Sequence, residues 1–143
     1  MSYLARWGES ARTIATPAEA EELVDDLARD YGPDGTRGIV VGIGPEGRAI
    51  ELEVAINTDE GRACLYWLGQ HPEYAVEAGI PAHPRAVPVW SYRDGEELPQ
   101  RRIPTDQTRL TPGRALAAVC EYVETGSRPD NVSWQPLPAP QAA

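Results

Sequence analysis

The segment that begins at Thr16 predicts an amphipathic helix with a marked start and end, so any fold of this chain must give that helix a surface to cover. Thr16, Pro17 and Glu19 form the pattern of a capping box with proline at the first helical position. Gly32-Pro33 ends the helix. Apolar residues recur on one face at three- and four-residue steps: Ala20, Leu23, Val24, Leu27, Ala28 and Tyr31.

A second helix is predicted near the end of the chain. Thr111 is its N-cap, Pro112 takes the first helical position and Gly126 closes it. The apolar face is expected to hold Leu116, Val119, Cys120 and Val123.

Five strands are expected around these helices. The segment 50–56 alternates Ile50, Leu52, Val54 and Ile56 with smaller or charged residues, which is typical of a strand with one buried face. The other strands are expected at 38–43, 63–68, 86–92 and 131–134, with Pro88 indicating an edge or a bulge. Residues 69–84, with three prolines, are expected to be irregular. We therefore predict an α+β fold, in which an antiparallel sheet of about five strands carries both helices on one face.

One domain is expected over residues 1–135, followed by a proline-rich disordered tail at 136–143. Apolar runs are too short for a signal peptide or a membrane span, which predicts a cytoplasmic protein. In a reducing compartment, Cys64 and Cys120 are expected to be free thiols in apolar surroundings.

The glycines at 42, 44 and 47 match the dinucleotide-binding pattern G-x-G-x-x-G. That chemistry requires a helix N-terminus immediately afterwards, because its free N–H groups bind the pyrophosphate. A strand is predicted there instead, so we interpret the glycines as positive-φ positions in a hairpin turn and expect no cofactor.

No catalytic set can be assembled from the sequence, and no metal site is expected. Cys64, His71, His83 and Cys120 are scattered without the short spacing of zinc ligands. His71 and His83 fall in the irregular segment with no nucleophile motif nearby, so a small enzyme built on them is the weakest alternative.

The net charge of −9 comes from 22 acidic and 13 basic residues. Such a surface repels nucleic acid and anionic membranes, and it favours a basic protein partner. We predict that the partner-binding surface lies on the acidic turn Asp94, Glu96 and Glu97 next to Trp90, with Glu73 and Tyr74 as an extension. An aromatic residue beside carboxylates can anchor a basic partner, whereas Trp7, Trp67 and Trp134 are expected to serve packing.

Taken in order, the segments resemble the Imm1 family of bacterial immunity proteins, found beside toxin genes in actinobacterial polymorphic toxin systems. The resemblance begins with the capped helix at 16–31 and continues through the segments 65–67, 89–92 and 103–104, with Tyr74, Gly79, Gly95, Glu97 and Pro99 between them. It is most telling at the end, where a helix at 115–122 leads to Thr125-Gly126-Ser127-Arg128-Pro129 and then to Val132-Ser133-Trp134.

The resemblance implies an α+β fold, no catalytic residues and a toxin as partner, often a nucleic-acid deaminase. The protein would then be a monomer that occludes the active site or the substrate groove of its toxin. The alternative from size and charge is an acidic secretion chaperone, which is usually a dimer and binds an extended segment of its effector.

Overall fold

The computed structural model describes residues 1–8, 10–31, 39–89, 92–93, 96–97 and 101–138. The helices are α1 (Pro17–Tyr31) and α2 (Pro112–Thr125), with a short 3-10 helix, η1 (Thr105–Gln107). The strands are β1 (Tyr3–Trp7), β2 (Ser10–Ile14), β3 (Ile39–Pro45), β4 (Leu52–Asn57), β5 (Arg62–Trp67), β6 (Glu73–Val76), β7 (Val87–Val89), β8 (Tyr92–Arg93), β9 (Glu96–Glu97), β10 (Arg101–Ile103) and β11 (Ser133–Pro136).

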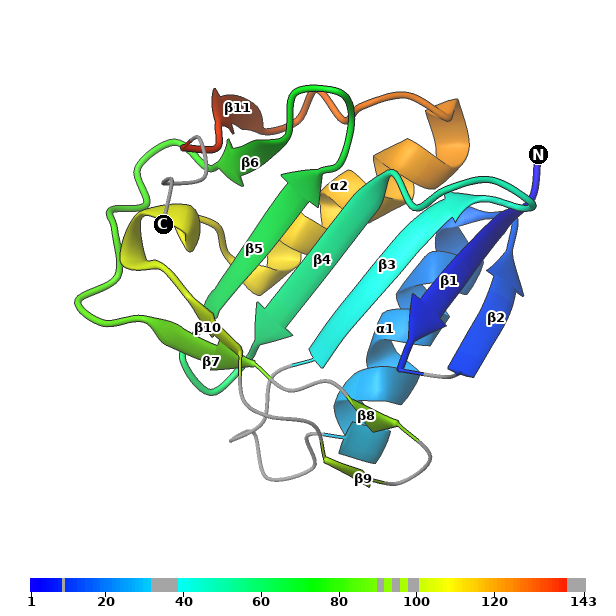
Figure 1. Ribbon diagram of the computed structural model, residues 1–143, viewed down its shortest axis with the longest axis horizontal. Coiled ribbons are helices and arrows are strands. Elements are labelled where there is room, and N and C mark those ends of the chain that lie inside the picture. Colours follow the sequence, from blue (N-terminus) through cyan, green and yellow to red (C-terminus); the bar gives the residue numbers. More distant parts are fainter. Residues whose placement is uncertain (9, 32–38, 90–91, 94–95, 98–100, 139–143) are drawn as a thin grey trace, which may run out of the picture.

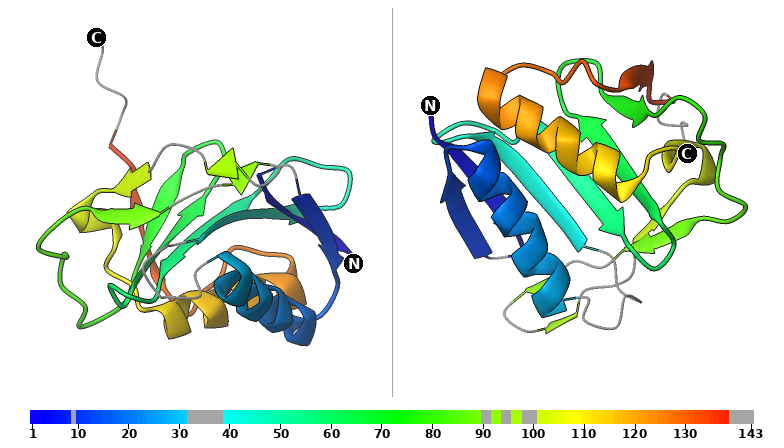
Figure 2. Two further views of the ribbon diagram at one scale, coloured as in Figure 1. Left: turned by 90° about the horizontal axis from the view of Figure 1, so that it is seen from below. Right: turned by 180° about the vertical axis from the view of Figure 1, so that it is seen from behind.

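The architecture is α+β, built on an antiparallel sheet of seven strands in the order β11-β6-β5-β4-β3-β1-β2 (Figure 1). Both helices lie on one face of this sheet, as the left view of Figure 2 shows. The core between them includes Ile43, Leu52, Leu65, Val119 and Tyr122, all buried. The predicted fold class and the placement of the helices are confirmed.

The predicted strand count is too low, because β1, β2 and β6 were not expected. β2 buries only Ile14 fully, so its sequence carries no alternating signal. β6 lies in the proline-containing segment that we expected to be irregular. The strand expected at 86–92 is shorter: β7 pairs with β10 in a separate two-stranded sheet, where Pro88 occupies an edge strand.

The capping residues of α1 act as predicted. The N–H of Glu19 donates to Thr16 Oγ1 at 3.2 Å, and Glu19 Oε1 accepts from the N–H of Ala15 at 3.2 Å. The predicted apolar positions Ala20, Leu23, Val24 and Leu27 are buried, whereas the side chains of Ala28 and Tyr31 lie outside the described part.

The predicted ends of α2 are also confirmed, but its buried face is rotated from the predicted one. Thr111 accepts from the N–H of Arg114 at 3.3 Å, and Gly126 adopts φ 74° with its N–H donating to the carbonyl of Tyr122. The buried residues are Ala115, Ala118, Val119, Tyr122 and Val123. Leu116 and Cys120 are only partly buried, and Leu116 packs against the edge of the core.

The start of α2 is also held by a carboxylate from the segment that follows β6. Glu77 Oε1 accepts from the N–H of Thr111 at 2.9 Å and from its hydroxyl at 2.7 Å. Burial alone would raise the pKa of Glu77, but these hydrogen bonds and nearby Arg114 outweigh burial and lower it.

We therefore expect Glu77→Gln to lower the free energy of unfolding at neutral pH by about 1 kcal/mol. A depressed carboxyl pKa contributes stability above the unfolded-state pKa, and that stability is lost as the pH falls through the folded-state value. The difference between variant and wild type should consequently shrink below a pH of about 4. Urea unfolding at a series of pH values measures this difference in the free energy of unfolding. The exposed Glu124→Gln is the matched control, and a pH-independent deficit in Glu77→Gln would contradict this account.

Strand β4 follows the glycine motif, as predicted, but our interpretation of two of its glycines was wrong. Only Gly47 has positive φ, at 82°, whereas Gly42 and Gly44 belong to β3. They are required by close packing. A Cβ on Gly44 would lie 2.3 Å from the carbonyl oxygen of Ala49, and one on Gly42 would lie 2.7 Å from Cδ1 of Ile50.

Gly44→Ala should therefore destabilise the protein by about 2 kcal/mol, because backbone atoms must shift to admit the methyl group. Gly113→Ala is the matched control, since a Cβ at that helical glycine meets nothing within 4 Å. Urea unfolding of both variants provides the measurement. Equal stability of the two variants would mean that β3 and residues 49–50 do not need this close approach.

The remaining sequence predictions concern cysteines, tryptophans and the chain end. Cys64 and Cys120 are free, as predicted. Trp7, Trp67 and Trp134 pack against the core, also as predicted. At the end of the chain, β11 runs through Pro136, and the N–H of Leu137 donates to the carbonyl of Pro72 at 3.0 Å.

Candidate interaction surface

The face of the sheet opposite the helices is partly covered by the chain from β7 to β10. Because side chains alternate along a strand, Ala55 of β4 and both Cys64 and Tyr66 of β5 point to this face. They form a second apolar cluster with Val89 of β7 and Ile103 of β10. The two-stranded sheet of β7 and β10, which we call the base, is thus packed on the main sheet (Figure 2).

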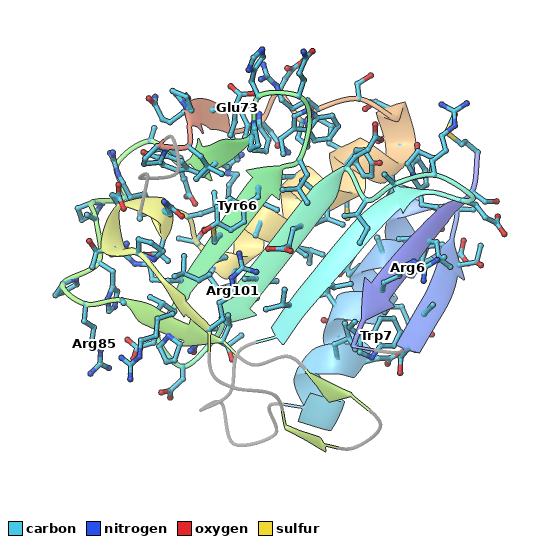
Figure 3. All side chains as sticks on the ribbon, in the orientation of Figure 1. Arg6, Trp7, Tyr66, Glu73, Arg85 and Arg101 are labelled. Carbon is cyan, nitrogen blue, oxygen red and sulfur yellow. The ribbon has the colours of Figure 1, made fainter. Side chains whose placement is uncertain are left out.

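Polar contacts fix this base in addition to the apolar cluster. Arg101 Nη1 lies 2.6 Å from Glu53 Oε1, and this ion pair links β10 to β4. The guanidinium also lies over the ring of Tyr66, with 5.5 Å between Cζ and the ring centroid (Figure 3). At the other strand, Asn57 Nδ2 donates to the carbonyl of Pro88 at 2.8 Å. Both strands of the base are therefore tied to the sheet by side chains of β4.

The ionisation states of the residues in this cluster indicate a structural role and not a catalytic one. Burial would lower the pKa of Arg101, but Glu53 outweighs it and the pKa is raised. Burial raises the pKa of the Cys64 thiol to about 12, and it also raises the pKa of Tyr66, whose hydroxyl donates to Gln107 Oε1 at 2.5 Å. Cys64 is therefore a protonated thiol at neutral pH, which is a poor nucleophile.

The hairpin β8–β9 extends from this base, with Tyr92 opposite Glu97 and Arg93 opposite Glu96. Of the residues predicted to bind the partner, Glu96 and Glu97 form β9, although their side chains are not described. Trp90 and Asp94 lie outside the described residues. In the sequence, β8 and β9 thus lie between the two strands of the base.

The predicted extension, Glu73 and Tyr74, lies on β6 and is not brought next to the hairpin (Figure 1). The Glu73 carboxylate pairs with Arg128, whose guanidinium lies 5.7 Å from the ring centroid of Trp134. Tyr74 is half-buried on the other face of β6, where it packs against the cluster around Tyr66. Both residues thus have structural contacts within the chain.

The two histidines have different surroundings. His83 Nε2 lies 3.2 Å from Glu60 Oε2, and the same carboxylate pairs with Arg85. This ion-pair group connects the turn after β4 with the segment before β7. His71 is exposed. Neither histidine is hydrogen-bonded to a serine or cysteine within the described residues, so no nucleophile and base come together at either histidine.

The described residues contain neither a metal-binding cluster nor a membrane-spanning helix. No group of three or more His, Cys, Asp or Glu side chains there is arranged to hold a metal ion. No helix in the same part of the chain is long and apolar enough to cross a membrane.

Sequence reasoning missed the residues that anchor the base. Arg101 and Glu53 are 48 residues apart, and Tyr66 and Gln107 are 41 apart. The alternation in β4 marked Glu53 as a residue of the polar face, but no local pattern indicates its partner.

Comparison with known proteins identifies one family. The family model described as Immunity protein Imm1 matches residues 8–136. The comparison with curated proteins gave no match.

Proposed function

The chain belongs to the Imm1 family of immunity proteins, and on this premise we propose that it binds and neutralises a toxin domain encoded beside its own gene. Neutralisation is by occlusion: the protein covers the active site or the substrate groove of the toxin and catalyses nothing. In this proposal it acts as a cytoplasmic monomer within an actinobacterial polymorphic toxin system.

The observation that carries the proposed contact surface is the anchored base formed by β7 and β10. Binding residues are commonly found on loops that a rigid scaffold positions. Here the Arg101–Glu53 ion pair and the apolar cluster around Tyr66 hold β10 and β7 on the main sheet, and the segment with Trp90, Asp94, Glu96 and Glu97 lies between these strands in the sequence. We assign toxin contact to these four residues.

Charge supports a basic toxin, such as a nucleic-acid deaminase. A toxin that acts on nucleic acid needs a positive substrate groove, and a protein with a net charge of −9 is attracted to that groove over a long range. The same charge disfavours nucleic acid and anionic membranes as ligands.

The test is co-expression of this protein with the toxin encoded by the neighbouring gene. Growth should be rescued, and native mass spectrometry should show a complex of one copy of each protein. Growth arrest with both proteins soluble would refute the proposal. A dimer of this protein holding an unfolded segment of the neighbouring protein would instead indicate a secretion chaperone.

A further inference from the structure

Strand β2 is the last strand of the seven-stranded sheet, and its outer edge has no strand partner among the described residues (Figure 1). The hydrogen bonding of β1 shows which groups face outward. The carbonyl of Ser2 accepts from the N–H of Glu46, beside β3, so alternate residues from Ser2 onward bond to β3 and the others bond to β2. Ala5 therefore bonds to Arg12, its partner in register, and the N–H and C=O groups of Ala11 and Thr13 point outward.

This edge lacks the usual protection against pairing with another chain. Its sequence, Ser-Ala-Arg-Thr-Ile, contains no proline, and the side chains of Ala11 and Thr13 are small and exposed. The opposite edge strand, β11, ends at Pro136, and Pro138 follows. Because an unpaired strand edge is a template for another strand, β2 is the open edge of this sheet.

The charge beside the edge indicates what can pair with it. Helix α1 carries six acidic residues and one arginine. Arg12 of β2 is already paired with Asp26 of α1, with 2.9 Å between Nη1 and Oδ2. Glu19 is held at the end of β2 by its hydrogen bonds to Ala15 and Thr16, and Glu22 is exposed on the same helix. A strand added to β2 therefore lies next to a negative surface.

The negative charge of this surface affects a second copy of this chain and a basic segment differently. A second copy of this chain would bring a second acidic α1 toward the first, which is repulsive. A basic segment would be attracted to it. We propose that the outer edge of β2 pairs with an extended, basic segment of the toxin, which adds a strand to the sheet. This inference rests on the proposed function and specifies how the toxin is held.

The position of β2 is compatible with a single partner that also touches the hairpin. The C-terminal end of β1, the start of β2 and the hairpin β8–β9 lie toward the same end of the sheet in Figure 1 and in the right view of Figure 2. A toxin segment along β2 would therefore bring the rest of the toxin toward the hairpin.

Amide hydrogen exchange followed by NMR tests this pairing. In the free protein, the outward amides of Ala11 and Thr13 should exchange rapidly, while those of Arg12 and Ile14, bonded to β1, should be protected. In the complex with the neighbouring toxin domain, exchange at Ala11 and Thr13 should slow by about tenfold or more. Protection at Arg12 and Ile14 should change little by comparison.

Variants provide a second readout. Ala11→Pro and Thr13→Pro each remove one outward N–H group and leave the ladder to β1 intact. Each should weaken toxin binding by roughly tenfold. Ala11→Val retains the N–H group and should bind as the wild type does. Circular dichroism identifies any variant that fails to fold, and the exchange experiment on the wild type needs no variant.

Three outcomes overturn the inference in distinguishable ways. If the complex forms without protection of the Ala11 and Thr13 amides, the inferred pairing at β2 is wrong, while the proposed immunity function still stands. Protection that appears when the concentration of this protein alone is raised assigns the edge to a second copy. If no complex forms with the soluble toxin domain, the proposed function is wrong, and the inferred pairing at β2 is wrong as well.

Discussion

Replacing Tyr122 by alanine is expected to lower the free energy of unfolding by about 3–5 kcal/mol, the usual cost of removing a buried aromatic ring. Tyr122 is fully buried where α2 meets the sheet. Its ring centroid lies 5.1 Å from that of Tyr3 and 5.7 Å from that of Trp67. The alanine variant leaves a cavity among these rings. Since domains are stable by only about 5–15 kcal/mol, urea unfolding should show the loss of a large share of the stability.

The companion variant Tyr122→Phe separates the hydroxyl from the ring. The Tyr122 hydroxyl donates to Glu51 Oε1 at 2.6 Å, so phenylalanine keeps the packing and leaves the carboxylate without this donor. We expect a loss of about 1–2 kcal/mol, smaller than that of the alanine variant. If both variants lose the same amount, the hydrogen bond outweighs the packing and our account of this junction is wrong.

Local patterns were enough to predict both helices. The Thr16–Glu19 capping box and the Thr111 and Gly126 caps involve residues within four positions of one another, and each forms hydrogen bonds across that distance. Local patterns also sufficed for β3, β4 and β5, because their buried and polar residues alternate or form short apolar runs.

The outer strands depend on contacts that no local pattern contains. β2 exposes most of its side chains, and it is a strand because its backbone pairs with β1. β6 is only four residues long, and it is held between β5 and β11. The sequence could not indicate these pairings, because no local pattern specifies which strand will lie beside which in the folded sheet.

The same limit applies to the candidate surface. Composition and an aromatic residue beside carboxylates were enough to propose the segment from Trp90 to Glu97. The contacts that hold β10 on the main sheet were not predictable, because Arg101 meets Glu53 only after β10 has folded back over β4. Glu73 was predicted as an extension of this surface from its charge, and its pairing with Arg128 in the folded chain was equally beyond any local pattern.

The second large effect concerns toxin binding through Trp90. If its ring is an anchor in the complex, Trp90→Ala should weaken binding by roughly a hundredfold, because aromatic residues at the centre of an interface often contribute 2 kcal/mol or more. The weaker binding should appear mainly as a faster dissociation rate of the complex. Surface plasmon resonance with the immobilised toxin domain measures both rates. Unchanged urea unfolding of the variant would show that the effect belongs to the interface.

Charge reversal on the hairpin should change the association rate constant of the complex. Glu96→Lys combined with Glu97→Lys should slow association about tenfold at low salt, with a smaller effect as the salt concentration rises, because steering by charge is screened. Asp94→Lys should act in the same direction. These variants test whether the acidic residues of the turn face the basic surface of the toxin.

The matched control is Glu124→Lys combined with Asp130→Lys, which changes the net charge by the same amount. Both residues are exposed, Glu124 in α2 and Asp130 between α2 and β11, so neither belongs to the hairpin or to the acidic surface of α1 beside β2. A toxin that docks on the hairpin should bind this control with nearly the association rate of the wild type. Equal slowing in the two double variants would mean that the total charge attracts the toxin, and that the contact surface lies away from the hairpin.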